Sequence, residues 1–195
     1  MNTAGSKGSF QAGRRRSRHL DLDHGRVEMS QGAGGRAMAD LHDLMFRRAF
    51  DNPLLDQANA QARFEVAAGR MVMSTDSFVI SPLFFPGGNI GSLAVHGTVN
   101  DLAMAGAQPL YLSAGFILEE GLPLAELARI VAAMTDAARQ AGVLIVTGDT
   151  KVVERGEGDG VFINTAGVGR VPAGLDISGD RARPGVRILV SGTVG

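Results

Sequence analysis

The feature that most constrains the fold is a succession of three apolar patterns between residues 110 and 146. Residues 110–118 are mostly apolar and predict a strand, and residues 124–141 repeat apolar side chains at the spacing of an amphipathic helix. Gly142 closes this helix, and residues 143–146 are apolar enough for a second, buried strand. The order strand, helix, strand predicts an α/β domain.

Further elements are expected on both sides of this unit. Residues 71–80 predict a largely buried strand, although Ser74, Thr75 and Asp76 in its middle are polar and need partners there. The remaining expected elements are a short strand at 27–29, a helix from Arg36 that Asn52 and Pro53 stop, a helix at 92–105 ended by Gly106, and strands at 159–169 and 185–191.

Composition and charge exclude several classes of protein. With 45% apolar residues, 20% charged residues and a net charge of −1, the chain has the balance of a globular protein and no surplus of positive charge for nucleic acid. The first basic cluster lies in a Gly/Ser-rich stretch, so residues 1–26 are expected to form a flexible leader. No stretch has the roughly 18 apolar residues of a membrane helix. We therefore expect a cytoplasmic protein without a membrane partner.

The chain contains no cysteine, which excludes disulfides, thiolate metal sites and a cysteine nucleophile within it. Its 27 glycines fall in short clusters between apolar segments. Such clusters are typical of loops that turn sharply or approach a ligand.

Three aspartates are the strongest candidates for a metal site. Asp76, Asp101 and Asp149 each lie next to small or hydroxyl residues, at or near the boundary of an expected element. Oxygen ligands on separate elements suit Mg²⁺, which proteins bind through few carboxylates together with nucleotide phosphates. Any one of these aspartates is explained as readily by a helix cap, a turn or a satisfied strand residue. The spacing alone leaves both interpretations open.

Two segments are candidates for binding phosphate. Residues 147–151 (Thr-Gly-Asp-Thr-Lys) follow the expected strand and would place free backbone amides, a carboxylate and a cation at its carboxyl end. Gly34 and Gly35 precede the helix from Arg36 and either wrap a phosphate or form only a tight turn. Neither the Walker spacing nor G-x-G-x-x-G after a strand occurs, so an ordinary P-loop or Rossmann site is not expected.

Five motifs follow one another in an order that identifies a family. They are STDSF at 74–78, PLFFPGGNIG at 82–91, NDLA at 100–103, GFILEEG at 115–121 and TGDTKVV at 147–153. From about Val27 to Gly195 the chain resembles the HypE family, also called carbamoyl dehydratases. The combination of the second and the fifth motif is far more specific than either alone.

This resemblance implies an α/β (α+β) fold of the PurM-like type at residues 27–170, with a mixed or antiparallel sheet packed by helices. The strands are expected to form a barrel across a homodimer, with ATP near the dimer interface. Asp76, Asp101 and Asp149 would be the carboxylates linked to Mg²⁺. The residues expected at the nucleotide are Gly34, Gly35, Asn89, Thr147, Gly148, Asp149 and Lys151, of which Lys151 is also the candidate stabiliser of the transferring phosphoryl group.

The resemblance also implies a reaction. A HypF-like carbamoyltransferase places a carbamoyl group on a C-terminal cysteine, and the family dehydrates this thiocarboxamide with ATP to a thiocyanate. The product supplies the cyanide ligands of NiFe hydrogenase through a HypC/HypD-like iron-carrying scaffold. Residues 171–195 are expected to be a linker and the first strand of a truncated second domain, and the family's cysteine is absent.

We therefore expect this chain to retain a nucleotide site and a dimer surface but not to perform the dehydration alone. One alternative is a non-catalytic dimerisation or nucleotide-binding fragment. Another is a different PurM-like Mg-ATP enzyme, such as selenophosphate synthetase, thiamine-monophosphate kinase or aminoimidazole ribonucleotide synthetase. The PLFFPGGNIG and TGDTKVV motifs argue against these enzymes.

Overall fold

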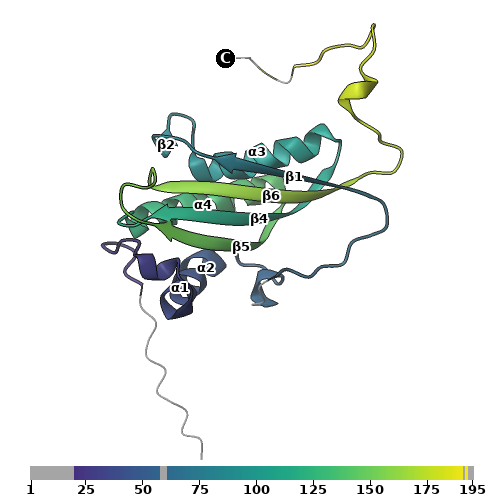
Figure 1. The fold of residues 1–195 in the computed structure, drawn as a ribbon. Coiled ribbons are helices and arrows are strands. Elements are labelled where there is room, and N and C mark those ends of the chain that lie inside the picture. The colour runs from purple at the N-terminus through teal and green to yellow at the C-terminus, as the bar shows by residue number, and fades with distance from the viewer. Residues whose placement is uncertain (1–19, 58–60, 191, 193–195) are drawn as a thin grey trace, which may run out of the picture.

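A four-stranded mixed sheet is the centre of the computed structural model, which describes residues 20–57, 61–190 and 192 (Figure 1). The strands are β1 (Arg70–Phe78), β4 (Gln108–Glu119), β5 (Leu144–Val153) and β6 (Val161–Val171), in the order β1-β6-β4-β5. β6 is antiparallel to both of its neighbours, whereas β4 and β5 are parallel. Parallel neighbours need a crossover, and α4 (Leu124–Ala141) supplies it. The predicted strand, helix, strand unit is confirmed.

Two helices cover one face of this sheet (Figure 1). α3 (Ile90–Met104) packs beside α4 and against β1 and β6. α4 ends at Gly142, whose φ of +67° is the left-handed conformation that glycine adopts without steric cost. The apolar stripe of α4 enters the core, and four of its side chains are at most 1% exposed: Leu127, Ile130, Val131 and Met134.

An N-terminal helical segment, residues 35–50, lies beside β5 (Figure 1). It consists of α1 (Gly35–Leu41), a π-helical turn η2 (His42–Phe46) and α2 (Arg47–Phe50). The shorter elements are η1 (Met29–Gln31), η3 (Leu55–Gln57), a hairpin of β2 (Phe84–Phe85) and β3 (Gly88–Asn89), and η4 (Gly179–Arg181). Among the described residues, no helix is both long and apolar enough to cross a membrane.

The predicted burial of β1 is wrong, because β1 lies at an edge of the sheet. Phe78 is its one buried residue, and Met73 is 71% exposed. β6 pairs with one side of β1, and the described residues place no strand on the other side. Ser74, Thr75 and Asp76 therefore do not carry the burial cost that the apolar pattern suggested.

The predicted strand at 27–29 is also wrong. Val27 exchanges backbone hydrogen bonds of 2.8 Å with Gly121 and Leu122, but the chain then turns into η1. Gly25 and Arg26, which belong to the described part of the expected leader, form hydrogen bonds with residues 121–124.

The strand predicted at 185–191 does not form over residues 185–190, and Ser191 lies outside the described residues. Ile188 and Leu189 are each 89% exposed. No described strand lies beside this segment, so its backbone groups have no ladder to join. Apolar composition alone was not sufficient for a strand here.

Asn52 joins the end of the helical segment to β5 and is only 5% exposed. Its amide nitrogen donates to the carbonyls of Phe50 (2.8 Å) and Ile145 (3.0 Å), and its oxygen accepts from the N–H groups of Leu54 (3.1 Å) and Leu55 (3.0 Å). Asn52→Ala removes all four bonds, so we expect the free energy of unfolding to fall by about 3 kcal/mol.

Urea denaturation measures this loss. The control is Gln57→Ala, which removes an exposed amide with one hydrogen bond of 3.1 Å to the carbonyl of Arg63 and should cost about 0.5 kcal/mol or less. Equal losses in the two variants would contradict the role given to Asn52.

Glu119 anchors the loop that connects β5 to β6. Its carboxylate accepts hydrogen bonds from the N–H groups of Gly156 (2.7 Å) and Gly160 (2.9 Å), and these bonds hold its pKa below the ordinary value of 4.5. A depressed folded pKa contributes stability that is present above pH 4.5 and is lost as the pH falls through the folded pKa. Glu119→Gln should therefore lower the thermal unfolding midpoint at neutral pH, and the difference should shrink below pH 4.5. A difference independent of pH would contradict this.

Candidate functional site

Residues 147–151 are predicted to follow a strand and to lie at its carboxyl end. They instead lie inside β5, and their backbone pairs in parallel with residues 113–117 of β4. The prediction of free amides at the end of a strand is therefore wrong. β5 is an edge strand, so only the side of its backbone that faces away from β4 remains outside the sheet.

A β-bulge sets the direction of the polar side chains in β5. The pairing with β4 shifts by one residue between Ile145 and Thr147, and Ile145 and Val146 are both buried. Beyond the bulge the ordinary alternation resumes, so Asp149 and Lys151 share one side of the strand. The bulge thus allows one strand to contribute both to the core and to a polar site.

Asp149 and Lys151 form an ion pair. The Lys151 Nζ lies 2.9 Å from Asp149 Oδ2 and 3.2 Å from Oδ1, and both side chains are more than half exposed. The hydrogen bond from Lys151 is the main reason why the pKa of Asp149 lies below its ordinary value. The carboxylate is therefore charged at neutral pH, and a cation stands beside it. This pair can meet a phosphate and a metal ion at one place.

A cavity of about 550 Å³ lies between the helical segment and β5. Its polar lining includes His42 and residues 147–150, together with Asp43, Arg47 and Gln61. Its apolar lining includes three aromatic rings, Phe46, Phe50 and Phe116. This combination of an apolar wall with a few convergent polar groups is typical of small-molecule sites. The predicted residues Thr147, Gly148 and Asp149 therefore line a cavity, which the sequence did not predict.

His42 is a member of this cavity that the sequence did not single out. Its Nε2 lies 3.0 Å from the hydroxyl of Thr150, which is 1% exposed. Burial lowers the pKa of His42, although the carboxylates of Asp149 and Asp43 act in the opposite direction. The imidazole is therefore neutral at neutral pH.

The predicted glycine loop lies at the start of α1, and neither of its glycines is part of the cavity lining. Gly34 and Gly35 have φ values of +82° and +76°, which explains why both are glycine. A Cβ on either would meet no atom within 4 Å, so the space above them is open. In contrast, a Cβ on Gly32 would lie 2.2 Å from the backbone nitrogen of Val152, which shows how closely this turn approaches β5.

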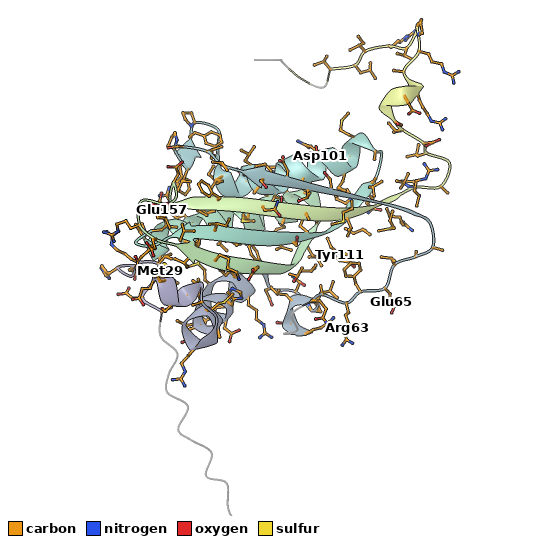
Figure 2. The ribbon with its side chains drawn as sticks, viewed as in Figure 1. Met29, Arg63, Glu65, Asp101, Tyr111 and Glu157 are labelled. Carbon is orange, nitrogen blue, oxygen red and sulfur yellow. The ribbon has the colours of Figure 1, made fainter. Side chains whose placement is uncertain are left out.

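Asp76 and Asp101 lie at the opposite edge of the sheet. The Ser74 hydroxyl donates to Asp101 Oδ2 at 2.8 Å, and Asp76 lies under α3 near Gly97. Figure 2 shows Asp101 on α3, across the sheet from the N-terminal helical segment. Both aspartates thus lie where β1 packs against α3.

The structure does not bring the three predicted aspartates together within one chain. The pairing register places Asp76 level with Thr165 of β6, Ala114 of β4 and Gly148 of β5. Asp149 is therefore at almost the same level as Asp76 but three strand spacings away, which is about 14 Å. No group of three metal-ligating side chains occurs among the described residues.

Two asparagines make hydrogen bonds near the candidate metal ligands or the predicted nucleotide contacts, and only one of them, Asn89, was predicted from the sequence. Asn89, a predicted nucleotide contact, caps α3, because its side chain accepts from the N–H of Ser92 at 3.0 Å. Asn164 was not predicted. Its amide nitrogen donates to Thr75 Oγ1 (3.2 Å), the Asp76 carbonyl (2.9 Å) and Ser77 Oγ (3.0 Å). Nothing in the local sequence around Asn164 indicates these contacts.

A second cavity of about 560 Å³ lies where the loop between β5 and β6 meets the turn at residues 121–122. Arg26 and Arg155 line it together with Glu119 and Glu120. It contains none of the predicted site residues. The cavity beside β5 is therefore the better candidate for the functional site.

Comparison with known proteins supports a specific family. The family model for "AIR synthase related protein, N-terminal domain" matches residues 59–171. Carbamoyl dehydratase HypE of Azotobacter vinelandii is 69% identical over 176 residues, which are 90% of this chain and 52% of that protein. The chain spans about half the length of the curated relatives it matches.

Two solved structures extend this similarity to three dimensions. A structure of hydrogenase maturation protein HypE in complex with ATP superposes with a TM-score of 0.78 at 58% identity, covering 80% of this chain and 47% of that one. A HypE–HypF complex gives a TM-score of 0.55 at 51% identity, covering 70% of this chain and 44% of the other. The mixed sheet with its helices is thus the fold of these proteins.

Proposed function

Because the chain belongs to the family of AIR synthase related proteins, whose N-terminal domain it carries, we propose that it forms the ATP-binding half of a HypE-type carbamoyl dehydratase. The observation that carries this proposal is the Asp149–Lys151 pair beside the cavity at the edge of β5. The similarity to a HypE that was solved with ATP supports the same ligand.

In this proposal Lys151 meets the transferring phosphoryl group, and residues 147–149 line the phosphate side of the site. Gly34 and Gly35 fold over the nucleotide, for which the open space above them leaves room. An amide oxygen is a poor leaving group, and its phosphorylation by ATP makes its loss feasible. Lys151 stabilises the charge that develops during this transfer.

Mg²⁺ fits the side chains that are present, although the described residues contain no cluster of three metal-ligating side chains. Asp76, Asp101 and Asp149 offer hard oxygen ligands, and Mg²⁺ usually needs only one or two carboxylates in addition to phosphate oxygens. We propose that these three residues hold it together with ATP. Bound there, Mg²⁺ would neutralise part of the charge on the phosphates.

A homodimer would resolve the distance between the two groups of aspartates. The sheet face opposite α3 and α4 carries exposed apolar side chains, among them Met71, Met73 and Ile117. Such a face is unfavourable in water. We propose that a second copy covers it, so that the strands form a barrel and Asp76 of one copy lies near Asp149 of the other.

Sedimentation equilibrium tests the dimer. Met73→Lys places a charge on the proposed interface and is expected to give a monomer. Met104→Lys is the control, because Met104 is 75% exposed on α3, on the helical side of the sheet, and should leave the dimer intact. A monomeric unchanged chain would contradict the proposal.

The partners and the reaction of the whole enzyme are part of the same proposal. A HypF-like carbamoyltransferase is the expected donor, supported by the solved HypE–HypF complex. A HypC/HypD-like scaffold is the expected acceptor, and the cytoplasm is the expected location. Because this chain contains no cysteine, the thiocarboxamide must be carried on another segment or chain. We therefore propose that this chain contributes nucleotide binding to the dehydration and does not catalyse it alone.

Isothermal titration of the chain with ATP, with and without Mg²⁺, tests the central part of this proposal. We expect one nucleotide per chain and a higher affinity with Mg²⁺. Binding of neither ATP nor Mg-ATP would contradict the proposal and favour the alternative of a non-catalytic scaffold.

A further inference from the structure

The helical segment beside the cavity contains a π-helical turn at η2 (His42–Phe46), between α1 and α2. Such a turn inserts one residue into an α-helix and rotates the following side chains by roughly 100°. π-Turns are uncommon and occur often at functional sites. Here the turn begins at the residue whose side chain reaches β5, which is His42.

The contact of His42 with Thr150 spans 108 residues of sequence and is 3.0 Å long. Thr150 is 1% exposed and lies between Asp149 and Lys151. Among the described residues, His42 is the one hydrogen-bond partner of its hydroxyl. Loss of this partner would leave a buried hydroxyl unsatisfied, which proteins avoid.

Aromatic packing holds the His42 ring in place. The ring makes an edge contact with Phe46, with 5.6 Å between centroids, and Phe46 stacks on Phe116 of β4 at 4.7 Å. The imidazole is thus fixed by the core on one side and bonded to β5 on the other. It is placed to set the position of residue 150 rather than to move freely in the cavity.

We propose that His42 is a positioning residue: through the Thr150 hydroxyl it holds residues 149–151 of β5 in the geometry in which Asp149 meets the metal ion and Lys151 meets the phosphates of Mg-ATP. This inference rests on the proposed function. It gives a side chain of the N-terminal helical segment a role in the site, in addition to the part that this segment has in lining the cavity.

A double-mutant cycle on Mg-ATP affinity tests the inference. His42→Phe keeps an aromatic ring against Phe46 and removes the hydrogen bond, and Thr150→Val keeps the shape of threonine and removes the hydroxyl. Each variant is expected to weaken Mg-ATP binding about tenfold. Because both remove the same contact, the double variant should bind no more weakly than the weaker single variant.

Two further variants separate positioning from general loss of structure. His42→Gln retains an amide nitrogen close to the place of Nε2 and should bind within about threefold of the unchanged chain. Thr135→Val removes another hydroxyl from the same region, one that donates to the Ala49 carbonyl at 3.2 Å, and should lower the unfolding midpoint while Mg-ATP affinity stays within about twofold.

The outcomes distinguish the two proposals. If the unchanged chain binds Mg-ATP and His42→Phe binds equally well, the role of His42 is wrong and the proposed function stands. Additive losses in the double variant, or an equal loss in Thr135→Val, would also overturn the positioning role. If the unchanged chain does not bind Mg-ATP, the proposed function fails and the inference about His42 fails with it.

Discussion

Replacing Gly148 with alanine is expected to cost about 3 kcal/mol or more of stability and to disrupt the candidate site at the same time. A Cβ on Gly148 would lie 2.0 Å from the carbonyl oxygen of Ala114, which is backbone and cannot rotate away. β5 would have to separate from β4 at the residue before Asp149. Urea denaturation measures the loss, and Mg-ATP titration of the folded fraction should detect no binding.

Gly115→Ala is the matched control, because Gly115 pairs with Asp149 in the same strand pair. The nearest atom to a Cβ there, the carbonyl oxygen of Asn164, is 3.8 Å away, which is ordinary contact. We expect a change of about 1 kcal/mol or less. Similar losses of stability in the two variants would show that the close approach of Gly148 to Ala114 is not the cause of the loss in Gly148→Ala.

Asp149→Asn is expected to weaken Mg-ATP binding about 100-fold or more, which corresponds to ~3 kcal/mol. The substitution removes the negative charge proposed as a metal ligand, and it leaves Lys151 without the carboxylate that lies 2.9 Å from its Nζ. Because both side chains are more than half exposed, stability should change little. Titration calorimetry and thermal unfolding measure the two effects separately.

Asp136→Asn provides the comparison. Asp136 has a similar exposure, 64% against 62% for Asp149, and pairs with Arg139 at 2.8 Å on α4. It lies outside the candidate site, so its loss should not affect Mg-ATP affinity. If Asp149→Asn retained the affinity of the unchanged chain, Asp149 would not belong to the nucleotide site.

Local sequence patterns predicted the elements that depend on one continuous apolar face. The helix at Leu124–Ala141 was predicted to the residue, because its apolar spacing is regular and Gly142 ends it. The sheet around it was predicted less completely. The strand expected at 143–146 continues to Val153, because pairing with β4 overrides the polar residues that interrupt the apolar run.

The exposure of the edge strand β1 could not be predicted from its composition. The apolar residues at both ends of the segment 71–80 predicted a buried strand, yet Met73 is 71% exposed, because no described strand lies on the outer side of β1. Exposed apolar side chains on such a strand are the kind of surface that a second copy can cover. The sequence thus indicates an apolar surface on β1 but does not indicate which partner covers it.

The candidate site was predictable in part. The resemblance to HypE singled out residues 147–151, which the structure places beside a cavity. His42 and Asn164 were missed, because their contacts join residues 108 and about 90 positions apart. The separation of Asp76 from Asp149 follows from strand order, which local patterns do not reveal.

Hydrogen–deuterium exchange of the chain with and without Mg-ATP tests the location of the site most directly. We expect slower exchange on nucleotide binding in residues 147–151 and around Gly34 and Gly35, with no change at the second cavity near Arg155. Binding that slows exchange only at that second cavity, or leaves residues 147–151 unaffected, would contradict the proposed nucleotide site.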